Sequence, residues 1–159
     1  MGPGKPDEEC YRIISERNLK DIMFVGEVSE DDKVRYFHSA DMFCSPATGG
    51  ESLGIVLMEA MASGKPVVAT DIEGCSTVIT HGTDGFLVPP KNDEARADAI
   101  KLLLSDSNLR DQIAANGQAR VEEFRWERVS KRVMGHYEKK LASPLSNHLK
   151  APTSPFVLF

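Results

Sequence analysis

The chain has 159 residues, of which 41% are apolar and 27% are charged, as is usual for one folded globular domain. Its net charge of −5 argues against a broad nucleic-acid-binding surface, although a small basic pocket stays compatible with it. No apolar run approaches the roughly 20 residues of a membrane span, and the N-terminus lacks the pattern of a signal peptide. The three cysteines are widely spaced, which favours reduced thiols and a cytoplasmic protein: Cys10, Cys44 and Cys75.

The predicted elements alternate between helices and strands along most of the chain. Helical periodicity covers residues 7–18, 31–39 and 53–63, with a short helix within 74–80 and helices over 93–141 that break at 105–107 and near Arg125. Short apolar runs predict strands at 21–26, 41–45, 67–70 and 86–88. This alternation predicts βαβ units and a parallel sheet, whose ligands bind beyond the carboxyl ends of the strands. The loops at those ends are 26–32, 45–53 and 70–76.

Two helices have recognisable ends. Ser29 and Asp32 stand in a capping-box-like arrangement that begins the helix over 31–39. The helix over 53–63 is apolar almost all round, so we expect it to be buried on all sides, and Gly64 suits the left-handed position that ends it.

The segment before the helix over 53–63 has the features of an anion site. A strand ends at Ser45, and Gly49 and Gly50 allow a tight turn. The first amides of the following helix lack intrahelical partners and lie at the positive end of its dipole, which suits a phosphate or diphosphate. Gly54 removes a side chain where a ligand would approach the backbone.

Two carboxylates bracket this predicted anion site. Glu51 precedes the helix, and Glu59 lies inside its otherwise apolar sequence, roughly 12 Å further along the axis. Carboxylates accept hydrogen bonds from sugar hydroxyls, so each is a candidate to hold one sugar of a nucleotide sugar. The alternative is that Glu51 is a solvated loop charge and Glu59 pairs with a lysine or arginine.

The segment GGESLGIVLMEAMASGKPVVAT, with Glu51 and Glu59 eight positions apart, resembles the signature of the retaining family-4 (group 1) glycosyltransferases. The similarity also includes GEVSEDDKVRYFHSADMFCSPA upstream, the turn HGTDGFLVPP and the closing helix RWERVSKRVMGHYEKK. Within that family, ADMFCSPATGGES followed by GIVLMEAMA is most similar to the phosphatidylinositol mannosyltransferases. The resemblance implies a Rossmann-like, three-layer parallel sheet, the C-terminal domain of the GT-B fold, with a helical C-terminal cap.

The resemblance also implies roles for particular residues. It makes Glu51 the catalytic carboxylate that holds the hydroxyls of the donor sugar, and it makes Glu59 the carboxylate that binds the ribose. The wall that meets the donor sugar and diphosphate consists of Ser52, Leu53, Gly54 and Ile55. The guanine-contacting turn of the mannosyltransferases falls on Val28, Glu30 and Lys33. No metal ion and no cofactor is implied beyond the donor substrate, which is GDP-mannose or another nucleotide sugar.

The function expected from the resemblance is retaining transfer of a hexose to a lipid or glycan acceptor. Residues 1–142 would form a partial nucleotide-sugar-binding domain that lacks its first strands, and residues 143–159 a flexible tail. The N-terminal acceptor domain of the family would be a missing partner. Two alternatives stay open: a non-catalytic nucleotide-sugar-binding module, and an enzyme that uses a UDP-sugar. The expected location is cytoplasmic, with the parent enzyme either free or peripheral on the membrane.

Overall fold

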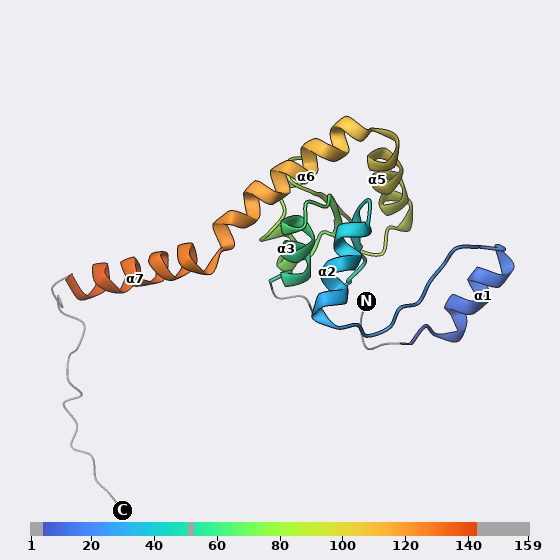
Figure 1. The fold of residues 1–159 in the computed structure, drawn as a ribbon, viewed down its shortest axis with the longest axis horizontal. Helices are drawn as coiled ribbons and strands as arrows, with labels where there is room; N and C mark the ends of the chain where they lie inside the picture. The colour runs from blue at the N-terminus through green and yellow to red at the C-terminus, as the bar shows by residue number, and fades with distance from the viewer. Residues whose placement is uncertain (1–4, 51–52, 143–159) are drawn as a thin grey trace, which may run out of the picture. The chain divides into compact units, whose positions relative to one another are not determined.

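The computed structural model describes residues 5–50 and 53–142. These residues divide between Val121 and Glu122 into two compact units. The first unit contains, in chain order, α1 (Glu8–Glu16), α2 (Glu30–Ser39), β1 (Phe43–Ser45), α3 (Ile55–Ala62), β2 (Val67–Thr70), α4 (Glu73–Ser76), β3 (Phe86–Val88), α5 (Asp93–Ser105) and α6 (Ser107–Val121), most of which are labelled in Figure 1. The second contains a 3₁₀ turn, η1 (Glu122–Phe124), and α7 (Trp126–Ala142).

The first unit is built on a parallel sheet with the strand order β1-β2-β3. Val67 of β2 is paired with Phe43 of β1, and Val68 of β2 is paired with Phe86 of β3. The three strands confirm the sequence predictions at 41–45, 67–70 and 86–88. Because the strands are parallel, their carboxyl ends lie at one edge, where β1 leads toward α3 and β2 toward α4.

The sheet separates two hydrophobic cores, which makes the fold a three-layer α/β arrangement. Val67 and Ala69 of β2 join a buried cluster with residues of α2, α3 and α4, among them Phe37 and Leu57. Val68 joins the other buried cluster, with side chains from β3, α5 and α6. Alternate residues of a strand face opposite sides of a sheet, so β2 contributes to both cores and is buried along its whole length.

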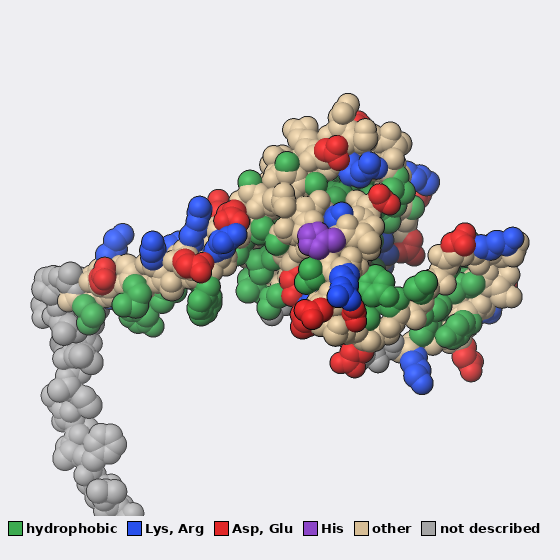
Figure 2. All heavy atoms as spheres, in the orientation of Figure 1, with side chains coloured by type: hydrophobic (Ala, Val, Ile, Leu, Met, Phe, Trp, Pro, Cys, Tyr) green, Lys and Arg blue, Asp and Glu red, His purple; other side chains and the backbone are tan. Residues whose placement is uncertain are grey.

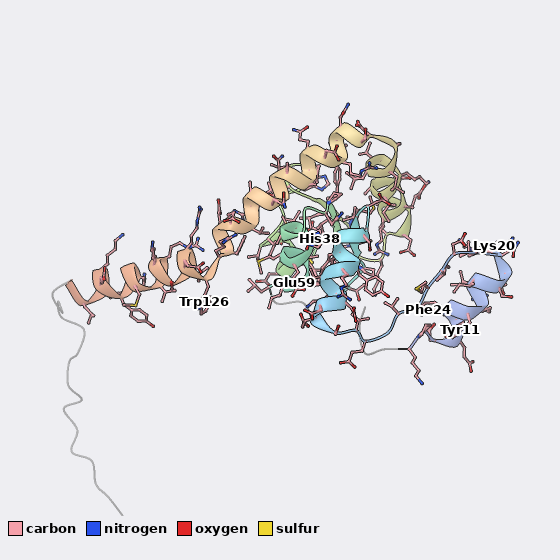
Figure 3. The ribbon with its side chains drawn as sticks, viewed as in Figure 1. Tyr11, Lys20, Phe24, His38, Glu59 and Trp126 are labelled. Atoms are coloured by element: carbon pink, nitrogen blue, oxygen red, sulfur yellow. The ribbon has the colours of Figure 1, made fainter. Side chains whose placement is uncertain are left out.

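The predicted strand over residues 21–26 is wrong, because this segment is irregular in the structure. Its apolar residues remain substantially exposed, including Met23 at 78% and Phe24 at 50%. A strand requires a hydrogen-bonding partner, and within the described residues the sheet consists of β1, β2 and β3 alone. Phe24 instead packs edge-on against Tyr11 of α1, with ring centroids 5.8 Å apart (Figure 3).

The expectation that the helix over 53–63 is buried on all sides is also wrong. Leu57, Ala60 and Met61 of α3 are fully buried, whereas Ile55 is 59% exposed. The helix packs against β1, β2 and α6, which cover only part of its circumference. Its end is as predicted, since Gly64 has a φ of +71°.

The start of α2 confirms the predicted capping arrangement. The Oγ atom of Ser29 accepts a hydrogen bond from the backbone N–H of Asp32 at 3.1 Å and donates one to Oδ2 of Asp32 at 2.8 Å. Together with the buried ring of Phe37, this cap fixes where α2 begins and which face it turns to the core. Lys33 lies in the first turn of the helix and so occupies a defined position.

The second unit presents an amphipathic helix. Figure 2 shows apolar side chains along one side of α7 and lysines and arginines along another. The exposed apolar residues are Trp126, Val133, Met134, Tyr137 and Leu141. Within the part of the chain that the structure describes, no helix has the length and hydropathy needed to cross a membrane. The predicted tail, residues 143–159, lies outside the described residues.

Candidate functional site

The predicted anion site lies where the chain passes from β1 to α3. Gly50 has a φ of +75° and Gly54 a φ of +60°, so the backbone turns at two left-handed positions. The carbonyl oxygen of Gly54 accepts hydrogen bonds from the N–H groups of Leu57 at 2.9 Å and Met58 at 3.2 Å, and these bonds begin α3. Amides in a first helical turn lie at the positive end of the helix dipole, which favours an anion.

The glycine at position 54 is required by packing as well as by conformation. A Cβ atom there would lie 3.0 Å from Cδ1 of Leu57 and 3.2 Å from the carbonyl oxygen of Gly74 in α4. The positive φ and this close approach each explain why a side chain is excluded. That Gly54 admits a ligand stays a prediction, and the sequence had not indicated the contact with Gly74.

Glu30, Lys33 and Glu59 lie together in the structure. The Nζ atom of Lys33 lies 2.9 Å from Oε1 of Glu59 and 2.6 Å from Oε2 of Glu30. The Lys33 side chain is 21% exposed, that of Glu59 is 35% exposed and that of Glu30 is 84% exposed. Figure 3 shows Glu59 on α3 beside α2. The pairing of Glu59 with a lysine is therefore observed, as one of the two sequence interpretations expected, and its ribose role stays a prediction.

The environment of Lys33 favours its charged form. The pKa of Lys33 is raised, chiefly by the hydrogen bond to Glu30 and next by the hydrogen bond to Glu59, while partial burial acts in the opposite direction. Lys33 is thus a full cation at neutral pH. With two carboxylates and one ammonium group, the cluster carries a net charge of −1. It suits hydroxyl donors and disfavours a phosphate.

The other sequence-predicted residues are placed as follows. Leu53 and Ile55 flank Gly54 at the start of α3, and these residues are 42% and 59% exposed. Val28 lines a shallow hollow of about 460 Å³ along α2, together with Asp32, Arg35, Tyr36 and Ser39. Lys33 and Glu59 are not among the residues given as lining this hollow. Glu51 and Ser52 lie outside the described residues.

The turn at residues 81–85 has a structural role. Asp84 is 5% exposed, and its Oδ1 atom accepts a hydrogen bond from the N–H of Thr80 at 2.6 Å. A Cβ atom at Gly85 would lie 2.9 Å from Cγ2 of Ile79. The Nδ1 atom of His81 accepts from the N–H of Leu87 in β3 at 3.0 Å. These contacts hold β3, the third strand of the sheet, in place.

Sequence reasoning named both Lys33 and Glu59 but missed that they contact each other. The two residues are 26 positions apart, on different helices. No local spacing rule links such positions, since helical periodicity relates only residues three or four apart. The signal available from sequence was a charged residue in an apolar helix, which requires a partner without naming it.

The sequence matches the family model described as "Glycosyl transferases group 1" over residues 1–120. A phosphatidyl-myo-inositol mannosyltransferase from Mycobacterium leprae is 41% identical over 135 residues, which are 85% of this chain and 36% of that protein. The present chain therefore spans about a third of the length of such relatives.

Solved structures show the same likeness. Sucrose-phosphate synthase from Thermosynechococcus elongatus is 31% identical with a TM-score of 0.73, and the match covers 84% of this chain and 34% of that one. The Anabaena HepE protein in complex with UDP and glucose is 27% identical with a TM-score of 0.72, and the match covers 83% of this chain and 36% of that one. By its sequence match over most of its length and by its fold, the chain belongs to the group 1 glycosyltransferase family.

Proposed function

We propose that this chain is the nucleotide-sugar-binding domain of a glycosyltransferase that moves mannose from GDP-mannose to a lipid or glycan acceptor, with retention at the anomeric carbon. The observation that carries the proposal is the position of Glu59. It lies on the same helix as the amides of the predicted anion site, one turn beyond Ile55, where Lys33 holds its carboxylate at 2.9 Å.

The charges at the two ends of the site favour one orientation of the nucleotide along α3. The helix begins with amides that favour an anion, so the diphosphate belongs near Gly54 and Ile55. The cluster of Glu30, Lys33 and Glu59 is net negative and offers acceptors for hydroxyl groups, so the nucleoside belongs there. One helical turn, about 5.4 Å, separates the two regions, which is compatible with a diphosphate joined to a ribose.

The chemistry proposed for the site is positioning and charge stabilisation. The amides that begin α3 would stabilise the negative charge that develops on the departing diphosphate. Glu51 would hold the hydroxyls of the donor sugar, and Ser52 and Leu53 would complete the wall beside it, as the family resemblance implies. Val28 would contact the base.

Mannose as the transferred sugar is supported by relatives such as the Mycobacterium leprae protein, which are named mannosyltransferases. A UDP-sugar is the second candidate donor, since the similar Anabaena structure contains UDP and glucose. The third candidate is binding of a nucleotide sugar without transfer, because the whole relatives are almost three times as long as the matched segment.

We further propose that residues 1–142 act as one nucleotide-sugar-binding domain, while the predicted tail, residues 143–159, lies outside the described residues. The acceptor would be bound by an N-terminal domain like that of the family, working as a partner of this chain. An enzyme with a lipid acceptor would act at the cytoplasmic membrane surface as a peripheral protein.

Calorimetric titration of the chain with GDP, UDP, GDP-mannose and UDP-glucose tests the proposal. We expect binding of GDP and GDP-mannose, and weaker binding of UDP and UDP-glucose. Tighter binding of the uridine ligands would favour the second donor. Failure of all four ligands to bind would contradict the proposed function. Transfer of mannose to a lipid acceptor, measured with GDP-mannose carrying a radioactive label in its sugar, separates an active enzyme from a binding module.

A further inference from the structure

We propose that Lys33 is a positioning residue whose ammonium group fixes the carboxylate of Glu59 in the orientation that binds a ribose. This inference rests on the proposed function, because it takes Glu59 as the ribose ligand. It assigns Lys33 a role that differs from the guanine contact implied by the family resemblance: Lys33 acts on the nucleotide through Glu59.

The contacts of Lys33 support this role. Two carboxylates hold its Nζ atom, Glu59 at 2.9 Å and Glu30 at 2.6 Å. Its side chain is 21% exposed, whereas that of Lys101, in an ordinary helical ion pair with Asp98, is 76% exposed. An ammonium group has three N–H donors, and these two carboxylates engage two of them. Most of the N–H donors of Lys33 therefore bind carboxylates of the protein itself and do not bind a ligand.

The helices that carry the pair are firmly anchored. Phe37 of α2 is 2% exposed, and Leu57 and Met61 of α3 are fully buried in the same hydrophobic cluster. Lys33 and Glu59 therefore extend from elements whose relative position the core fixes. The contact between the two side chains spans 26 residues of sequence and joins α2 to α3.

Fixing Glu59 in this way favours ligand binding. A glutamate side chain loses rotamer freedom when it binds a ligand, and a side chain that is already held loses less. The hydrogen bond that Lys33 donates to Glu59 goes to Oε1. A carboxylate has about four lone-pair sites, so the group keeps acceptor capacity for a ribose hydroxyl. Lys33 thereby orders the acceptor without occupying it completely.

The test is a double-mutant cycle with Lys33→Met, Glu59→Gln and the double variant. GDP and 2′,3′-dideoxy-GDP, which lacks both ribose hydroxyls, are titrated into each protein, and the ratio of their affinities measures recognition of the ribose. In the wild type, we expect GDP to bind about tenfold more tightly. Glu59→Gln should abolish most of this preference, and Lys33→Met should reduce it about 2-fold to 10-fold. The double variant should be no worse than Glu59→Gln.

The outcomes separate the two proposals. Additive losses in the double variant, or an unchanged preference in Lys33→Met, would overturn the positioning role. A wild-type preference for GDP that Glu59→Gln leaves intact would overturn the ribose assignment and thus the proposed function. Failure of the wild type to bind GDP or UDP would overturn both. Lys101→Met is the matched control and should bind like the wild type. Circular dichroism checks the fold of each variant, and Lys33→Gln replaces Lys33→Met if the latter unfolds.

Discussion

The ammonium group of Lys33 lies 2.9 Å from a carboxylate oxygen of Glu59, and this ion pair joins the first turn of α2 to the middle of α3. Both helices contribute to the same core, against one face of the sheet. The pair therefore links the segment around Glu30, predicted to contact the base, to the helix that begins at the predicted diphosphate site.

Replacing Glu59 by glutamine should weaken nucleotide binding irrespective of the base. A hydrogen bond to a charged acceptor contributes roughly 1.5–3 kcal/mol, so we expect affinity to fall about tenfold or more. The loss should be similar for GDP and UDP, because the ribose is common to both. Calorimetric titration measures the affinities, with Glu138→Gln, an exposed site on α7, as the matched control. A loss restricted to one of the two nucleotides would contradict the ribose assignment.

The contribution of Lys33 to stability should depend on pH in the alkaline range. Its pKa is raised in the folded protein above the ordinary value of about 10.4, by Glu30 and then by Glu59. A group with a raised folded pKa stabilises the protein fully below its unfolded pKa, and the effect is lost as the pH rises through the folded pKa.

The measurement is urea unfolding of the wild type and Lys33→Met between pH 8 and pH 11. We expect the difference in the free energy of unfolding to be constant near pH 8 and to shrink toward the alkaline end. Other titrating groups are common to both proteins and cancel in the difference. A difference that grows with pH would show that the ion pairs do not favour the charged lysine.

Gly54→Ala should destabilise the protein. The new methyl group would lie 3.0 Å from Leu57 and 3.2 Å from the carbonyl oxygen of Gly74, at a φ of +60°. Strain of this kind costs about 1–3 kcal/mol. Urea unfolding measures the cost, and Gly135→Ala on α7 is the control, because no atom lies within 4 Å of its added Cβ. There alanine should stabilise the helix by up to about 1 kcal/mol. Equal stability of the two variants would contradict the packing role of Gly54.

Asp84→Ala should destabilise the first unit by about 1–3 kcal/mol, because the N–H of Thr80 loses its acceptor in a part-buried hydrogen bond. Asp84→Asn keeps an oxygen at the same position and should cost less. The order of the two variants in thermal unfolding is the decisive observation. An equal loss for asparagine and alanine would show that the carboxylate charge, rather than the hydrogen-bond acceptor, stabilises the turn.

Local patterns determined most of the secondary structure and the family. The strands β2 and β3 coincide with their predicted segments, and Ser29 caps α2 as its spacing with Asp32 indicated. These features depend on neighbours within a few residues. The glycosyltransferase signature around Glu59 is also continuous in the sequence, so it can be identified from the sequence alone.

Tertiary structure decided what depends on distant partners. The segment 21–26 has the composition of a strand, but within residues 5–50 and 53–142 no strand pairs with it, so it remains irregular and Met23 is exposed. The exposed fraction of α3 depends on the elements that pack against it, namely β1, β2 and α6. The sequence of the helix does not specify which elements these are. The partner of Glu59 is Lys33, 26 residues away, because packing of α2 and α3 in a common core brings them together. The sequence indicated that a charge within an apolar helix needs a partner, and the fold supplied it.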